Sequence, residues 1–265
     1  MKVVTPRLRD EPAVLVTVSR TQGSAPRDCG AWMLVFPRDV DGTIGGGHVE
    51  LEAIAFAREM LASDERETHS REYKLGPSLG QCCGGTMQLR LERVDAQDIA
   101  ALDARLAPSL APLALFGGGH VGRALIHALA PLPFAITWID SRDEIFPDAV
   151  PHDVRCEHSD PVQAAVPQLA SQSRVLVMSF SHAEDLDIVA ACLKRIRERN
   201  DLPYVGLIGS RTKWATFRHR LEQRGFTAAE LERITCPIGV PGVAGKQPEV
   251  IAASTVAQIL QVAPP

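Results

Sequence analysis

The chain has 265 residues, is 45% hydrophobic and 23% charged, and carries a formal net charge of −4, which is typical of a globular protein with one or two domains. The mild negative charge, without a run of lysine or arginine, gives no support to nucleic acid or an anionic membrane surface as a partner. No stretch approaches the ~20 apolar residues of a membrane helix, and the first residues show no signal-peptide pattern, so we expect a cytoplasmic protein.

The N-terminal half has the pattern of a mixed α/β domain. Val14–Val18 and Trp32–Phe36 are apolar runs typical of buried strands, and Asp41-Gly42 predicts a turn after the second run. A later segment alternates apolar and polar residues, as a half-buried strand does; its apolar members are Met87, Leu89 and Leu91. Between these strands a helix is predicted over about 49–61, with five apolar residues on one face: Val49, Ala53, Phe56, Ala57 and Met60.

The segment DAQDIAALDARLAPSLAP predicts a short amphipathic helix that joins two domains. Its apolar residues have helical spacing, and Pro108 and Pro112 end the helix. We therefore expect an N-terminal domain over 1–107, which includes this helix, and a C-terminal domain over 108–265.

The C-terminal half alternates strands with helices. Strands are predicted at Leu113–Phe116, Ala135–Asp140, Val175–Phe180 and Tyr204–Ile208, and helices at about His120–Ala130, Glu184–Glu198, Thr212–Arg224 and Pro248–Leu260. This alternation indicates a parallel sheet with helices on both faces. The predicted fold class is α/β, with an N-terminal mixed α/β domain and a C-terminal Rossmann-like parallel-sheet domain. The two halves differ in element order, which argues against a duplication.

The pentapeptide GGGHV nevertheless occurs twice, and its second copy has the pattern of a phosphate-binding loop. Gly117, Gly119 and Gly122 follow a predicted strand and open a predicted helix, as in dinucleotide-binding folds. Asp140 ends the next strand, 18 residues after Gly122, where a carboxylate would bind ribose hydroxyls. Arg142 would suit a phosphorylated ribose. The alternative is a Rossmann-like fold that keeps these glycines for packing alone.

Two more groups of polar residues follow predicted strands at the same edge of the sheet. Ser210, Arg211 and Lys213 lie at a helix start, where backbone N–H groups and two cations suit a second anion. His182 and Glu184 follow the strand before it. For both groups the alternative is an ordinary capped helix with charged residues near its end.

The first GGGHV copy differs because Glu50 stands where the third glycine would be. A carboxylate suits the first turn of a helix but repels a phosphate. Gly45, Gly46 and Gly47 therefore predict a close backbone approach to a ligand or to another strand. His48 is a candidate ligand-binding residue, and the alternative is a surface histidine.

Two adjacent cysteines form the last candidate site. Cys82 and Cys83 precede Gly84 and Gly85 in the stretch GQCCGG. Two soft sulfurs in a glycine-rich turn suit a soft metal, a persulfide or thiol exchange. The alternative is one buried cysteine beside an incidental neighbour.

Together these stretches resemble one family. TQGSAPRDCGAWMLV, TIGGGHVE, GQCCGG, LALFGGGHVGRAL, GLIGSRTKW and CPIGVPGVAGKQPEVIAAS are similar, in this order, to the xanthine dehydrogenase accessory proteins of the XdhC/CoxI type, from about Ala13 to Leu260. The resemblance implies a cytoplasmic chaperone that binds the molybdenum cofactor, a molybdopterin, protects it, and promotes its sulfuration and insertion into xanthine dehydrogenase or a related molybdenum hydroxylase. Cys82 and Cys83 then become candidates for holding molybdenum or relaying sulfur.

The implied partners are the apo molybdoenzyme and a cysteine desulfurase, and the implied protein performs no turnover of its own. Gly45–Gly47 and His48 would line the cofactor cleft of the N-terminal domain, and Gly117–Gly122 would hold a phosphate. Two other readings stay open. One is an NAD(P)-dependent oxidoreductase with His182 as its acid or base, and the other is a nucleotide-sensing module. A homodimer is common for a chain of this size.

Overall fold

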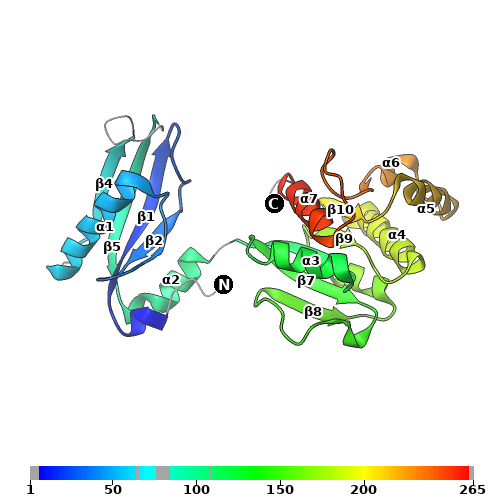
Figure 1. Cartoon of the computed structure of the whole chain (residues 1–265), viewed down its shortest axis with the longest axis horizontal. Helices are drawn as coiled ribbons and strands as arrows, with labels where there is room; N and C mark the ends of the chain where they lie inside the picture. Colours follow the sequence, from blue (N-terminus) through cyan, green and yellow to red (C-terminus); the bar gives the residue numbers. More distant parts are fainter. Residues whose placement is uncertain (1–5, 64–65, 76–83, 108, 263–265) are drawn as a thin grey trace. The chain divides into compact units, whose positions relative to one another are not determined.

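The computed structural model of the chain describes residues 6–63, 66–75, 84–107 and 109–262 (Figure 1). The contacts between residues divide the chain into two compact units, one within 2–107 and one within 108–265.

The N-terminal unit is built on an antiparallel five-stranded sheet in the order β3-β2-β1-β5-β4. The strands are β1 (Ala13–Gln22), β2 (Trp32–Val35), β3 (Val40–Gly42), β4 (His69–Lys74) and β5 (Thr86–Val94). The helical segments are η1 (Pro6–Arg9), α1 (Gly47–Ala62), η3 (Ala96–Asp98) and α2 (Ile99–Leu106).

The central strand β1 is apolar on both faces because helices cover both sides of it. Val14, Val16 and Val18 join the hydrophobic core that includes the inner face of α1. Ala13 and Leu15 point into a second core, which contains Leu102 of α2 and Leu8. The helical pattern predicted over 49–61 is confirmed, since Val49, Ala53, Ala57 and Met60 are the buried residues of α1.

Two expectations for this unit need correction. Asp41-Gly42 does not form the turn after β2; Gly42 pairs with Met33 in strand β3. The turn lies earlier, where the Phe36 N–H donates to the Asp39 carbonyl at 2.9 Å, and Pro37 suits such a turn. Strand β4 was not predicted, because it is a polar edge strand in which only Tyr73 is buried.

The C-terminal unit is built on a parallel six-stranded sheet in the order β11-β10-β9-β6-β7-β8. The strands are β6 (Ala111–Phe116), β7 (Phe134–Asp140), β8 (Val154–His158), β9 (Arg174–Val177), β10 (Tyr204–Leu207) and β11 (Ile234–Thr235). The helical segments are α3 (His120–Leu129), η4 (Asp143–Ile145), η5 (Val162–Gln168), α4 (His182–Arg199), α5 (Arg211–Gln223), α6 (Ala228–Leu231) and α7 (Pro248–Leu260).

This strand order is that of a doubly wound dinucleotide-binding sheet, which confirms the predicted Rossmann-like unit. One face of the sheet packs on α4 and α5, and the other packs on α3 and α7 (Figure 1). The strand order reverses between β6 and β9, which are neighbours in the sheet. Ligands of such folds bind beyond the carboxyl ends of the strands at this switch point.

The predicted strand Val175–Phe180 is too long. Strand β9 ends at Val177, because the Ser179 N–H donates to the Asp185 carboxylate at 2.8 Å rather than to a neighbouring strand. Phe180 consequently lies in a loop with 67% of its surface exposed. Strands β8 and β11 were not predicted, since β8 has one buried residue, Val154, and β11 is two residues long.

Within the described ranges, no helix has the length and apolar character needed to cross a membrane.

A buried arginine holds η5 against α4. Arg195 is 4% exposed. Its guanidinium donates to Asp201 at 2.9 and 2.7 Å and to the Val166, Leu169 and Ala170 carbonyls at 2.7 to 3.3 Å.

We expect Arg195→Met to lower the free energy of unfolding by about 3–5 kcal/mol, because it leaves Asp201 and three carbonyls without their charged donor. Arg197→Met is the matched control on the same helix, since Arg197 binds Glu230 with two hydrogen bonds at the surface, where water replaces them. Urea unfolding of both variants measures the difference, and equal losses would contradict the prediction.

Candidate functional site

The loop between β6 and α3 is shaped by two glycines that permit no side chain. Gly117 has φ +123°, and a Cβ there would lie 2.0 Å from the Met178 carbonyl oxygen. A Cβ on Gly122 would lie 2.0 Å from the Gly117 carbonyl oxygen. The first glycine thus lets the loop turn against the end of β9, and the last lets α3 pack on the loop.

Gly119, the second glycine of the Gly117-Gly119-Gly122 pattern, differs from the other two. Gly119 is the N-cap of α3 with φ −71°, and no side chain caps the helix. A Cβ on Gly119 would meet nothing within 4 Å. Packing does not require glycine here, whereas the open space and the uncapped helix start suit a phosphate group.

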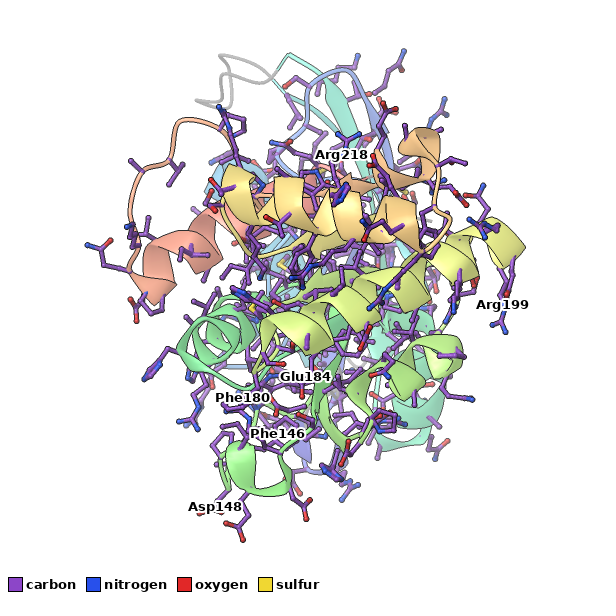
Figure 2. All side chains as sticks on the ribbon, turned by 90° about the vertical axis from the view of Figure 1, so that its right-hand side faces the viewer. Phe146, Asp148, Phe180, Glu184, Arg199 and Arg218 are labelled. Carbon is purple, nitrogen blue, oxygen red and sulfur yellow. The ribbon has the colours of Figure 1, made fainter. Side chains whose placement is uncertain are left out.

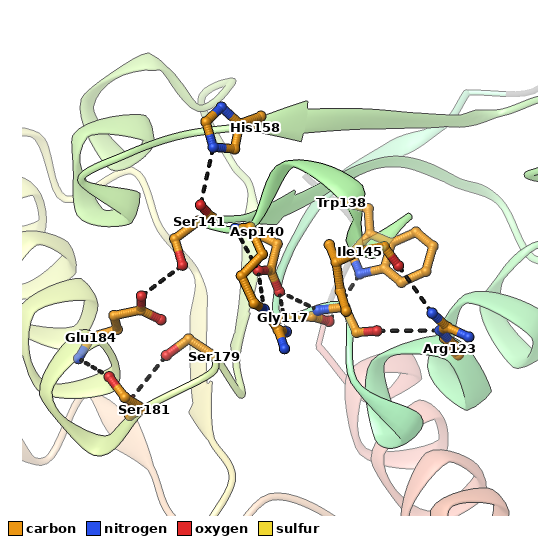
Figure 3. Close-up of polar contacts among 12 residues, drawn as sticks. Gly117, Arg123, Trp138, Asp140, Ser141, Ile145, His158, Ser179, Ser181 and Glu184 are labelled. Atoms are coloured by element: carbon orange, nitrogen blue, oxygen red, sulfur yellow. Dashed lines mark hydrogen bonds and ion pairs between the residues drawn. The ribbon is translucent and has the colours of Figure 1, made fainter. Parts of the chain in front are cut away.

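The buried carboxylate of Asp140 holds this loop by a hydrogen bond from Gly118. Its side chain is 1% exposed. The Asp140 Oδ2 accepts the Gly118 N–H at 2.6 Å and the Arg142 Nη2 at 2.9 Å, and Oδ1 accepts the Arg142 backbone N–H and Nε, each at 2.9 Å (Figure 3). Burial raises the pKa of Asp140, but these hydrogen bonds outweigh burial and leave the pKa below its ordinary value. Both oxygens are therefore engaged, and binding of ribose here would require exchange of these partners.

The strand ends next to the loop carry the other predicted residues. Ser210 caps α5 through the Lys213 N–H at 3.1 Å. The Lys213 ammonium binds Asp185 at 2.6 Å and the Ile208 carbonyl at 2.9 Å, while the Asp185 carboxylate also accepts the Ser179 hydroxyl at 2.8 Å. The Lys213 ammonium is therefore engaged by groups of the protein itself, whereas Arg211 is the exposed cation at this helix start.

A pocket of about 310 Å³ opens beside this helix start. Its lining includes His182, Ser210, Lys213 and Arg220. His182 is exposed and packs edge-on against the Phe217 ring. In α4 the capping alternative applies, because Ser181 accepts the Glu184 N–H at 3.2 Å.

In the N-terminal unit, both predicted glycine segments lie against the loop that follows β1. A Cβ on Gly45 would lie 2.5 Å from Cβ of Pro26, and a Cβ on Gly85 would lie 2.5 Å from the Ser24 carbonyl oxygen. Gly46 and Gly84 have open space in place of a Cβ. Gly45 and Gly85 therefore both lie against residues 22–27, although they are distant in sequence.

The other candidates of the N-terminal unit are His48, Cys82 and Cys83. The His48 Nε2 lies 2.8 Å from the Glu52 carboxylate on the surface of α1. Cys82 and Cys83 lie outside the described residues. Within the described part of the chain, no group of three or more histidine, cysteine, aspartate or glutamate side chains is placed to hold a metal ion.

Glu50 explains why the first GGGHV copy is not a phosphate loop. Gly45, Gly46 and Gly47 all have positive φ, and their loop closes on the Glu50 carboxylate. Its Oε2 accepts from the Thr43 hydroxyl at 2.5 Å, the Ile44 N–H at 2.9 Å and the Gly46 N–H at 3.0 Å. The carboxylate thus occupies the cradle of N–H groups that a phosphate would otherwise fill.

Sequence reasoning missed one part of the site, which joins the ends of β7 and β9. Arg142 lies over the Phe180 ring with its Cζ 4.6 Å from the ring centroid, and the Ser141 hydroxyl donates to Glu184 Oε1 at 2.6 Å (Figure 3). The sequence feature that could have indicated this contact is Phe180, an aromatic residue directly before the helix cap Ser181, which was predicted to end a strand.

Comparison with known proteins gives matches in both units. Residues 113–259 match the XdhC Rossmann domain, and residues 7–73 match the XdhC and CoxI family. The uncharacterized protein YqeB of Escherichia coli (strain K12) is 27% identical over 254 residues, which are 95% of this chain and 43% of YqeB. The chain thus spans less than half the length of that relative.

Two solved structures were also compared. A crystal structure described as a xanthine dehydrogenase from Bacillus halodurans matches with a TM-score of 0.77 and 21% identity, covering 96% of this chain and 92% of that chain, so the two share a fold. A Rossmann-fold NAD(P)-binding family protein from Shigella flexneri matches with a TM-score of 0.40 and 18% identity, covering 58% of this chain and 89% of that chain.

The different roles of the loop glycines are testable by alanine substitution. We expect Gly117→Ala to lower the free energy of unfolding by on the order of 3 kcal/mol, because the new methyl group, at a positive φ, collides with the carbonyl of Met178, just after β9. Gly119→Ala should lower it by only about 0.5–1 kcal/mol, because the methyl group meets open space and the remaining cost is that of alanine as an N-cap. Thermal unfolding of both variants measures this, and similar losses would refute the assignment.

The role of Glu50 predicts a pH dependence. Burial raises the pKa of Glu50, but the hydrogen bonds from Thr43, Gly46, Ile44 and Gly45 together lower it below 4.5. The ionised group therefore stabilises the fold above pH 4.5, and this contribution is lost as the pH falls through the lowered pKa. We expect Glu50→Gln to cost about 1–2 kcal/mol near pH 7 and much less at about pH 3. Urea unfolding at both pH values measures this, and a constant difference would contradict it.

Proposed function

The chain belongs to the XdhC and CoxI family, and from this premise we propose that it is an accessory protein of a xanthine dehydrogenase or a related molybdenum hydroxylase. In this proposal it binds the molybdenum cofactor, a phosphorylated molybdopterin, protects it, and delivers it in sulfurated form to the apo enzyme. A cysteine desulfurase would supply the sulfur. The protein would act stoichiometrically in the cytoplasm and carry out no turnover of its own.

The observation that carries the proposal is the open space beside Gly119 at the start of α3, in a unit that matches the XdhC Rossmann domain. Gly119 leaves that space open and the helix has no side-chain cap, so the backbone N–H groups of its first turn suit the terminal phosphate of molybdopterin. Glu50 fills the corresponding cradle in the N-terminal unit, which leaves the α3 start as the better phosphate site.

The molybdenum end of the cofactor would supply the metal centre of the client enzyme. In our proposal Cys82 and Cys83 contact it or carry the transferred sulfur, because thiolates are the soft ligands available beside Gly84 and Gly85. A Cβ on Gly84 would meet open space, so other described residues do not cover the backbone next to the two cysteines.

A second candidate function is nucleotide sensing, favoured by the strand order of the C-terminal unit and by Asp140 at the end of β7. The third reading, an NAD(P)-dependent oxidoreductase, needs an acid or base near the nicotinamide. His182 is exposed at the start of α4 and is the candidate for that role. Steady turnover of NAD(P)H would exclude both non-enzymatic functions.

The deciding measurement is anaerobic binding of purified molybdenum cofactor. We expect near-stoichiometric binding by the wild type. Gly119→Asp should weaken it by about tenfold or more, because aspartate is a favourable N-cap yet places a negative charge where the phosphate would lie. Gly119→Asn is the matched control, because asparagine has the same shape as aspartate and is an equally favourable N-cap but carries no charge.

Cys82→Ala and Cys83→Ala complete the series. Loss of binding in either variant would support a sulfur-lined molybdenum site. Binding that survives both changes but not Gly119→Asp would leave the chaperone function in place and assign the cofactor to the glycine loop. A wild-type protein that fails to bind the cofactor would overturn the proposed function.

A further inference from the structure

The ends of β7 and β9 meet above the end of β6. In the sheet β6 lies between these two strands, yet two side-chain contacts join the neighbours across it. Arg142 stacks on Phe180, and Ser141 bonds Glu184. Figure 2 labels Phe180 and Glu184 among the side chains drawn as sticks. Both contacts therefore span the switch point, next to the glycine loop that begins where β6 ends.

The two halves of the Arg142–Phe180 stack are held very differently. Arg142 is fixed by three hydrogen bonds to Asp140, which also holds the Gly118 N–H of the glycine loop. Phe180, in contrast, is 67% exposed, more than the other large apolar side chains of the described residues. Aromatic rings and arginine guanidinium groups both stack on planar heterocycles, and this pair lies beside the glycine loop.

Glu184 adds a polar group to the same place. Its Oε1 is occupied by Ser141, but its Oε2 is buried and has no hydrogen-bond partner among the described residues. A buried carboxylate oxygen without a donor is costly. Glu184 is tied to the residue next to Arg142 through this Ser141 bond, and its charge, after that of Asp140, helps to raise the pKa of Arg142.

We propose that Phe180 and Arg142 sandwich the planar ring of the ligand whose phosphate binds at the start of α3, and that Glu184 accepts hydrogen bonds from the amino edge of that ring. Phe180 moves to admit the ring, because 4.6 Å is too short for two van der Waals contacts of roughly 3.5 Å each. This inference rests on the proposed function, since molybdopterin carries both a phosphate and a pterin ring.

The carboxylate selects the class of ring. A pterin or a guanine presents an amino group and an adjacent ring N–H, which are two donors, whereas adenine presents its amino group beside an acceptor nitrogen. A carboxylate can only accept. The shared chemistry recognised by this site is therefore a 2-amino-4-oxopyrimidine ring, from either a pterin or a guanine nucleotide.

The test measures equilibrium binding of three probes to the full chain: anaerobic molybdenum cofactor, GMP and AMP. Phe180→Leu should weaken binding of the cofactor roughly tenfold, whereas Phe180→Tyr should bind it as tightly as the wild type, because stacking needs an aromatic ring. Glu184→Gln should weaken the cofactor and GMP but leave AMP unchanged. Leu260→Ala, a change at a 54% exposed leucine of α7, is the control for removal of exposed apolar surface and should change nothing.

The outcomes separate this inference from the proposed function. Cofactor binding by the wild type that is unaffected by Phe180→Leu would overturn the stacking site and leave the chaperone function in place. Binding of GMP but not cofactor, with the expected loss in Phe180→Leu, would support the stacking site and overturn the chaperone function. Equal losses for GMP and AMP in Glu184→Gln would overturn the role of Glu184. A wild type that binds none of the three probes would overturn both proposals.

Discussion

The buried carboxylate of Asp140 is the interaction on which the carboxyl edge of the Rossmann-like sheet depends. It ties the glycine loop to the end of β7 through Gly118, and it fixes Arg142 by three hydrogen bonds. An ionised carboxylate tolerates this burial only because every partner is a donor. The glycine loop and the guanidinium that covers Phe180 are thus held by one charge, so loss of Asp140 would loosen both at once.

A second buried charge organises the other side of the switch point in the same way. Asp185 accepts from Ser179 and Lys213, and this ends β9 early and turns the following loop outward. Phe180 is exposed as a direct consequence. The strand ends that carry candidate ligand-binding groups are therefore shaped by carboxylates rather than by apolar packing, which explains how an exposed aromatic ring is presented beside an open helix start.

The repeated GGGHV pentapeptide shows how far local sequence determines chemistry. Both copies begin a helix, and both place N–H groups around a position suited to an anion. In the first copy that position holds Glu50 of the same helix, whereas in the second the residue at the equivalent place is Gly122 and the space outside Gly119 is open. The two loops also differ in backbone, since Gly45, Gly46 and Gly47 all have positive φ, whereas Gly119 has φ −71°.

Sequence alone determined the two-part α/β organisation, the parallel sheet and the different characters of the two glycine loops, because hydrophobic periodicity and glycine spacing are local properties. It did not reveal the polar edge strand β4, the true end of β9 or the pairing of Arg142 with Phe180. These depend on tertiary contacts. The Ser179 N–H, for example, donates to the Asp185 carboxylate rather than to a neighbouring strand. Only the tertiary structure decided that Asp140 faces Gly118 and Arg142, since a carboxylate at a strand end takes the donors that packing brings to it.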